Sequence, residues 1–182
     1  LVAFHARQRP DAEALVFEDQ RMSWRDFERA VNQVANGIIA SGVARREMVA
    51  ILAHNSPAYF VTLFGILKAG ACAVPLSGMA DVGALRLLLE DCGAKLLFAS
   101  ASLLALADGA RAGNALLDDG HCIAFDGRQA GWQGFDAWRD GHAVDADRPR
   151  ELVDDRRVRD VEGVHRSGRD VADALARAPE RL

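Results

Sequence analysis

The fold is decided by the stretch Phe64-Gly65-Ile66-Leu67-Lys68-Ala69-Gly70-Ala71-Cys72-Ala73-Val74-Pro75-Leu76. It contains the last turns of an apolar helix, a glycine break, a short apolar strand and a proline that ends the strand. A helix that returns directly into a buried strand is typical of sheets whose parallel strands alternate with helices. The stretch therefore predicts an α/β fold.

The segments before this stretch supply the strand and the helix start that lead into it. Residues 48–53 show no polar alternation, as expected for a strand that is covered on both faces. Ser56 can cap the helix that follows, and Pro57 suits its first position, where the missing N–H costs nothing.

Further strands and helices alternate downstream. The sequence predicts strands at residues 71–74, 95–99 and 122–125, helices at residues 82–92 and 102–107, and a short helical segment near the surface at residues 131–138. Right-handed connections between such units give a mostly parallel sheet flanked by helices on both faces.

The N-terminal region predicts a small hairpin followed by a long helix. Residues 14–17 and 21–24 are strand candidates that a turn can join. Ser23 can then cap a helix that ends near Ser41-Gly42. The face of this helix opposite its apolar stripe is predicted to carry Arg25, Glu28, Arg29, Asn32 and Gln33.

Composition excludes several classes of protein. At 182 residues, with 50% hydrophobic and 26% charged residues, the chain can bury one substantial core. A formal net charge of -4 gives no reason to expect a nucleic-acid partner. No apolar run approaches the roughly 20 residues that a membrane span needs, and the N-terminus lacks the pattern of a secretory signal. We therefore expect a cytoplasmic protein, with its oligomeric state open.

The cysteines favour packing over chemistry. Cys72, Cys92 and Cys122 are isolated, without the Cys or His spacing of a metal site. Cys72 and Cys92 have apolar neighbours, so buried free thiols are expected. The sequence predicts neither a bound metal nor a disulfide.

Five ordered signatures together resemble the opening region of the adenylate-forming enzymes, the superfamily of acyl-CoA synthetases, luciferases and peptide-synthetase adenylation domains. The resemblance covers about residues 4–138. Its motifs are Arg9-Pro10-Asp11-Ala12-Glu13-Ala14-Leu15, Met22-Ser23-Trp24-Arg25-Asp26-Phe27, Met48 to Leu52 with His54-Asn55-Ser56-Pro57, Leu67-Lys68-Ala69-Gly70-Ala71 with Val74-Pro75-Leu76, and Leu87-Leu88-Leu89-Glu90-Asp91-Cys92-Gly93-Ala94-Lys95.

The resemblance implies ATP-dependent activation of a carboxylic acid, fatty or aryl, to an acyl-adenylate and then a thioester of coenzyme A. Such chemistry needs donors for the triphosphate, a metal such as Mg²⁺, and a cation for charge that develops on the phosphate. The family supplies these with a Ser/Thr/Gly-rich loop that ends in Pro-Lys-Gly, a downstream acidic motif and a C-terminal Lys. No position of this chain matches them. We therefore assign no catalytic, cofactor-binding or metal-binding residue here, and we expect the chain alone to be inactive.

Two residues are weighed individually as ligand contacts. Lys68 lies beside Gly70 and could hold a phosphate, but a cation near a helix C-terminus is favoured by the helix dipole. His54 follows a strand end and could contact a ligand, or be a solvated or capping residue. The remaining histidines share no motif, and the tryptophans are expected to pack rather than to stack on bases; these residues are His5, His121, His142, His165, Trp24, Trp132 and Trp138.

The character of the sequence changes after about residue 146. We expect residues 1–146 to form the N-terminal subdomain of a synthetase-like fold. Residues 147–182 are half charged and lack aromatic residues, which predicts a poorly ordered tail, with a marginal helix possible at residues 171–178.

The tail also suggests a frameshift. Lys68 and Lys95 are the two lysines among 22 basic residues, and this arginine preference is typical of GC-rich coding DNA. If suitable codons are chosen for residues 157–163, the reading frame shifted by one nucleotide can encode Gly-Ser-Gly-Thr-Ser-Lys-Gly. This peptide resembles the missing phosphate loop. We hypothesise that the tail is a frameshifted remnant.

Two other functional classes stay open at this point. The chain could be a stand-alone α/β binding or interaction domain without catalysis. It could also be a Rossmann-like nucleotide-binding enzyme, but Gly37, Gly42, Gly65 and Gly70 do not form the dinucleotide fingerprint.

Overall fold

The computed structural model describes residues 1–126 and 129–145. They belong to the first of two compact units, Leu1–Arg148; the second unit is Pro149–Leu182. The predicted charged tail, its marginal helix and the frameshift hypothesis therefore concern residues outside the described ones.

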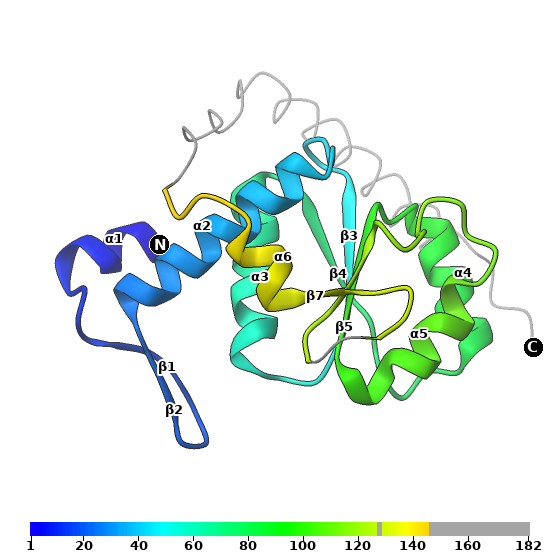
Figure 1. Ribbon diagram of the computed structural model, residues 1–182, viewed down its shortest axis with the longest axis horizontal. Helices are drawn as coiled ribbons and strands as arrows, with labels where there is room; N and C mark the ends of the chain where they lie inside the picture. Colours follow the sequence, from blue (N-terminus) through cyan, green and yellow to red (C-terminus); the bar gives the residue numbers. More distant parts are fainter. Residues whose placement is uncertain (127–128, 146–182) are drawn as a thin grey trace, which may run out of the picture. The chain divides into compact units, whose positions relative to one another are not determined.

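A five-stranded parallel sheet forms the centre of the described unit (Figure 1). Its strand order is β4-β3-β5-β6-β7. The first of these strands in the sequence, β3, is therefore an inner strand, and later strands are added on both sides of it. The strands are β3 (Met48–Leu52), β4 (Cys72–Pro75), β5 (Leu96–Ala99), β6 (Cys122–Ala124) and β7 (Gln133–Gly134). The predicted α/β fold with a mostly parallel sheet is confirmed.

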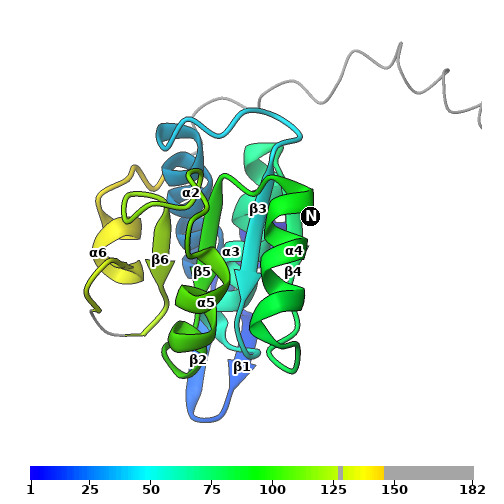
Figure 2. The same cartoon turned by 90° about the vertical axis from the view of Figure 1, so that its right-hand side faces the viewer.

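Helices cover both faces of this sheet. One face packs on α2 (Trp24–Ala40), α3 (Pro57–Ala69) and α6 (Phe135–Asp140), and the other packs on α4 (Val82–Cys92) and α5 (Leu104–Arg111). Figure 2 shows α4 and α5 in front of the strands and α2 and α3 behind them. Along β3, Ile51 belongs to the first core and its neighbour Leu52 to the second. Such two-sided burial explains why the strands read as continuous apolar runs.

The predicted boundaries of α3 are confirmed by their caps. The Ser56 hydroxyl accepts a hydrogen bond from the Tyr59 N–H at 3.2 Å, and Pro57 is the first helical residue. Gly70 ends the helix with φ of 78°, a left-handed conformation that favours glycine. A Cβ at Gly65 would lie 2.4 Å from Cγ1 of Val34, so glycine permits the close approach of α3 to α2.

The N-terminal region forms a helix and a hairpin. The antiparallel pair of β1 (Glu13–Phe17) and β2 (Gln20–Ser23) confirms the predicted hairpin and extends away from the parallel sheet (Figure 1). The helix α1 (Val2–Gln8) was not predicted, and the His5 ring in it lies 4.5 Å from the Trp24 ring, centroid to centroid.

Two predicted segments differ in the structure. The helix expected at residues 102–107 begins as a 3₁₀ turn, η1 (Ala101–Leu103), and continues as α5 to Arg111. The segment at residues 131–138 was predicted as a surface helix, but it contains β7 and the start of α6. Its aromatic rings, those of Trp132, Phe135 and Trp138, are buried in the core, while Asp136 and Ala137 are exposed. Within the described ranges, no helix has both the length and the apolar character of a membrane span.

Candidate functional site

The carboxyl ends of the strands form the edge at which sheets of this type bind ligands. His54 follows β3 and is exposed, Ser77 follows β4, and the buried Ser100 follows β5. Ser77 Oγ accepts a hydrogen bond from the Met79 N–H at 3.2 Å, and the hydroxyls of Ser100 and Ser102 lie 3.4 Å apart. The edge thus presents an imidazole and hydroxyls that are already engaged locally.

These groups do not fit a triphosphate or its metal. None of the described residues that directly follow β3, β4, β5 or β6 is Lys or Arg, so a cation for a phosphate is lacking there. Nowhere in residues 1–126 and 129–145 do three His, Cys, Asp or Glu side chains gather as a metal site. The role of His54 stays a prediction.

Lys68 lies far from this edge. The helix α3 starts at the carboxyl end of β3 and runs back toward the amino end of β4, and Lys68 is in its last turn. Its Nζ donates a hydrogen bond to Oδ1 of Asn32 in α2. Partial desolvation of the amino group lowers the pKa of Lys68, against the opposite effect of the nearby Glu28 carboxylate. The side chain therefore joins two helices.

Amide side chains on α2 hold the last described residues of the chain, 142–145, which we call the exit segment. Asn32 Nδ2 donates to the Val144 carbonyl at 2.8 Å, and Gln33 Nε2 donates to the His142 carbonyl at 3.2 Å. Asn36 Nδ2 donates to the carbonyls of residues 143 and 145 at 2.8 and 2.9 Å. The predicted placement of Asn32 on the open side of the helix is wrong, because the exit segment covers and buries it.

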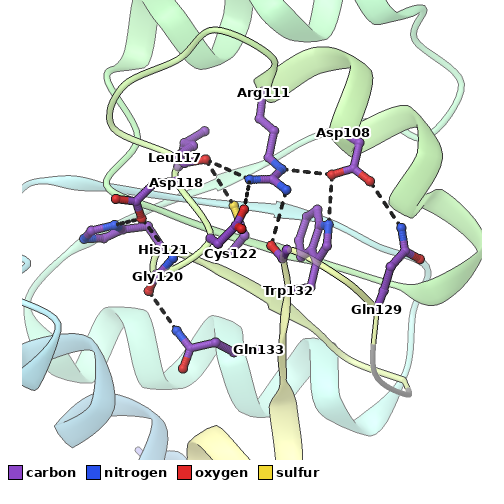
Figure 3. Close-up of polar contacts among 12 residues, drawn as sticks. Asp108, Arg111, Leu117, Asp118, Gly120, His121, Cys122, Gln129, Trp132 and Gln133 are labelled. Atoms are coloured by element: carbon purple, nitrogen blue, oxygen red, sulfur yellow. Dashed lines mark hydrogen bonds and ion pairs between the residues drawn. The ribbon is translucent and has the colours of Figure 1, made fainter.

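Arg111 is the centre of a second polar network, at the C-terminus of α5 (Figure 3). Its Nε donates to Asp108 at 2.9 Å, and its Nη1 donates to the Leu117 carbonyl at 3.1 Å and to Asp119 at 3.2 Å. Its Nη2 donates to the Gly131 carbonyl at 3.2 Å. Four of the five guanidinium N–H groups are therefore used inside the protein.

Asp108 extends this network to the segment before β7. Its carboxylate accepts hydrogen bonds from Trp132 Nε1 at 2.9 Å and from Gln129 Nε2 at 3.2 Å. Burial alone would lower the pKa of Arg111, but its hydrogen bond to Asp108 and further acidic neighbours raise it instead. Because its donors and acceptors are matched, we interpret this network as a structural tie between α5 and the loops on either side of β6.

A hollow of about 280 Å³ lies at the amino ends of the strands. Its lining consists of Ser41, Gly42, Glu47, Lys95, Ala115, Leu116 and His121. Lys95 pairs with Glu47 at 3.8 Å, and His121 Nδ1 lies 2.6 Å from Asp118, whose pKa is lowered by that hydrogen bond. The residues of both contacts therefore pair with each other, and the hollow is at the opposite end of the sheet from the carboxyl edge.

The other candidate residues have packing roles. Trp132 and Trp138 are buried, as predicted, and His142 packs edge-on against Trp138 with ring centroids 5.3 Å apart. Cys122 is buried and free, and burial raises its pKa to about 11. Cys72 and Cys92 are free but only partly buried, since they lie on an edge strand and at a helix end. His165 falls outside the described residues.

Comparisons with known proteins agree with this architecture. An indoleacetate–CoA ligase of Aromatoleum aromaticum is 34% identical over 145 residues, which are 79% of this chain and 28% of that enzyme. Tyrocidine synthase 3 of Brevibacillus parabrevis is 37% identical over 97 residues, 53% of this chain and 2% of the synthase. The crystal structure of an anthranilate CoA ligase in complex with anthranoyl-AMP superposes with a TM-score of 0.74 at 27% identity, covering 79% of this chain and 28% of that one.

The matched part is thus less than a third of the length of those ligases. The signature of the AMP-binding enzymes matches residues 2–159, which include the whole parallel sheet and both helical layers. The chain therefore belongs to the AMP-binding enzyme family.

Proposed function

We propose that this chain provides the N-terminal subdomain, residues 1–146, of an AMP-forming ligase that activates a carboxylic acid and transfers it to coenzyme A. The observation that supports this most is the 34% identity to the indoleacetate–CoA ligase across 79% of the chain. ATP, Mg²⁺ and coenzyme A are then the cofactors and substrates of the whole ligase. A cytoplasmic location is part of the same proposal.

An aryl or arylacetic acid is the favoured substrate class. The relatives that support it are the indoleacetate ligase and the anthranilate ligase, at 34% and 27% identity. A fatty acid is the alternative, since a fatty acid–[acyl-carrier-protein] ligase of Streptomyces coeruleorubidus is 31% identical over 96 residues.

The chain alone is proposed to be inactive. Its sequence lacks the phosphate loop, the acidic motif and the catalytic Lys of the family, and the described carboxyl edge offers no cation for a phosphate. It contributes the framework instead: a sheet whose carboxyl edge carries His54 and Ser100.

Pyrophosphate exchange into ATP tests both statements. The purified 182-residue chain should show no exchange with indoleacetate, anthranilate, benzoate or palmitate. The chain joined to the part of the A. aromaticum ligase that lies downstream of the matched region should show acid-dependent exchange, strongest with an aryl acid. Exchange by the chain alone would refute its inactivity, and an inactive but folded fusion would refute the ligase assignment.

Residues 147–182 are proposed to arise from a frameshift. The support is the arginine-rich composition and the loop-like reading of residues 157–163 in the neighbouring frame. Sequencing the coding DNA from the Ala143 codon to several hundred nucleotides beyond the Leu182 codon tests this. A phosphate-loop motif in a shifted frame supports the proposal, and an intact frame without such a motif in any frame rejects it.

A further inference from the structure

One face of α2 is adapted to hold the exit segment, residues 142–145. Three amide side chains donate four hydrogen bonds to main-chain carbonyls of this segment, at 2.8 to 3.2 Å; the donors are Asn32, Gln33 and Asn36. On the same helix Gly37 leaves room for the chain, because a Cβ there would lie 2.6 Å from Cη2 of Trp138 and 2.7 Å from Cδ2 of His142. The polar contacts and the missing side chain therefore serve the same region.

The exit segment buries little of its own surface. His142 and Val144 are half-buried, and Ala143 and Asp145 are exposed. A few hydrogen bonds and the entropy that is lost when a short segment becomes ordered are of similar size in free energy. The state in which α2 holds the segment is therefore only marginally favoured, and the loss of one or two hydrogen bonds should release it.

The exit segment joins the described sheet to the rest of the polypeptide. The family signature continues beyond it, to residue 159. None of the described residues that directly follow β3, β4, β5 or β6 is Lys or Arg, so this edge of the sheet offers no cation for a phosphate. In the proposed ligase, such a cation belongs to the part of the polypeptide that follows the exit segment.

We infer that Asn32 and Asn36 are positioning residues of the proposed ligase: by holding the exit segment on α2, they fix the point from which the ATP-binding part of the polypeptide continues. The inference rests on the proposed function. Both residues act through the main chain of residues 143–145 and need no contact with ATP. If ATP binds when the segment is held, its apparent dissociation constant is inversely proportional to the held fraction. Release of the segment then weakens ATP binding without changing the chemistry of the bound state.

Isosteric substitutions in a joined polypeptide test the inference. In this polypeptide the compact unit Leu1–Arg148 is followed directly by the part of the A. aromaticum ligase downstream of the matched region. Asn32→Asp and Asn36→Asp keep the shape of the side chain but replace the amide donor with a carboxylate oxygen, which cannot donate to a carbonyl. Gln133→Glu is the matched control, because Gln133 Nε2 donates at 2.8 Å to a different carbonyl, that of Gly120.

The inference predicts a change in KM for ATP, measured by acid-dependent pyrophosphate exchange. KM should rise about fivefold in Asn32→Asp, and about tenfold or more in Asn36→Asp, which loses two hydrogen bonds. The values of kcat and of the melting temperature should change little, and Gln133→Glu should behave as the unsubstituted polypeptide. A lower kcat or melting temperature with an unchanged KM would overturn the inference, because a purely structural role gives that result.

Hydrogen exchange in the exit segment gives a second readout, which needs no turnover. Coupling between two sites is reciprocal, so ATP must slow hydrogen exchange at residues 142–145 if the held segment favours ATP binding. Without ATP, hydrogen exchange there should be faster in Asn36→Asp and unchanged in Gln133→Glu. A rate at residues 142–145 that does not respond to ATP would contradict the positioning role.

The two readouts separate this inference from the proposed function. Protection of residues 142–145 by ATP without acid-dependent pyrophosphate exchange supports the positioning role and refutes the ligase activity. Pyrophosphate exchange without such protection, and with an unchanged KM in Asn36→Asp, supports the ligase activity and refutes the positioning role.

Discussion

Lys68 Nζ donates a hydrogen bond to Oδ1 of Asn32, and this contact fixes which way the Asn32 amide faces. A lysine ammonium can only donate, so the amide oxygen must point toward it. The amide nitrogen then points to the Val144 carbonyl, which accepts from it at 2.8 Å. Lys68 in α3 thus acts on the exit segment through a residue of α2.

Replacing Lys68 tests this relay, by which we mean the effect of Lys68 on the exit segment through the Asn32 amide. Lys68→Met keeps the aliphatic stem but removes the donor, so the Asn32 amide loses its fixed orientation. We expect faster amide hydrogen exchange in the exit segment, with little change in melting temperature. Lys95→Met is the control, because the amino group of Lys95 pairs with Glu47 at 3.8 Å instead of with Asn32. Equal effects of the two substitutions would contradict the relay.

Asn36 should be the strongest single contact to the exit segment. Asn36→Ala removes two hydrogen bonds and Gln33→Ala removes one. Each bond contributes about 1 kcal/mol, so local opening of the exit segment should be easier in Asn36→Ala than in Gln33→Ala. Limited trypsin digestion at Arg139 provides the measurement. A faster cut in Gln33→Ala than in Asn36→Ala would show that the hydrogen bonds do not hold the segment.

We expect that even a conservative substitution of Arg111 destabilises the protein. Lys cannot reproduce the guanidinium fork, so Arg111→Lys removes the hydrogen bond and ion pair to Asp108 and leaves the Gly131 carbonyl without the Arg111 donor. We expect a loss of about 2–3 kcal/mol in the free energy of unfolding in urea, with a shift in the Trp132 emission. The control Arg25→Lys alters an exposed pair with Asp11 at 3.1 Å and should cost less than about 1 kcal/mol.

Gly65→Ala tests the approach of α3 to α2. The added methyl would overlap Val34, whose Cγ1 lies 2.4 Å from the ideal Cβ position, and should destabilise the protein by about 1–3 kcal/mol. The double variant Gly65→Ala/Val34→Ala makes room for the methyl. The double variant should lose less free energy of unfolding than the sum of the losses in the two single variants. A loss equal to that sum would argue against the contact.

Deprotonation of Cys122 should lower the free energy of unfolding at alkaline pH. Its pKa is raised by burial to about 11 from a usual value near 9, so the folded state holds the thiol proton longer than the unfolded state does. The resulting stability is present below about pH 9 and is lost as the pH rises toward 11, by roughly 2–3 kcal/mol. Urea unfolding of the protein and of Cys122→Ala over this range should show a steeper fall for the former.

Local rules predicted most of the fold. A cap at Ser56, a proline at the first position and a glycine at residue 70 set the bounds of α3, and continuous apolar runs identified β3 and β5. Each signal acts within a few residues. The helix α1 was missed because it has only seven residues and its tertiary contacts, such as that of His5 with Trp24 in a later helix, are not visible in its own sequence.

The polar contacts could not be predicted in the same way. Asn32 looked like a solvent-facing residue, because helical periodicity reports how a helix meets one core and not what covers its other side. Its partner Val144 is 112 positions away in the chain. The hydrogen bond between Asp108 and Trp132 also joins residues that are distant in the sequence, by 24 positions. We interpret the network that they belong to as structural rather than catalytic.

All four hydrogen bonds that α2 side chains donate to the exit segment are accepted by main-chain oxygens. A carbonyl is present in every amino acid, so these hydrogen bonds fix the path of the chain at residues 143–145 without requiring particular side chains there. Substitutions among residues 143–145 that keep the backbone path therefore leave these hydrogen bonds available.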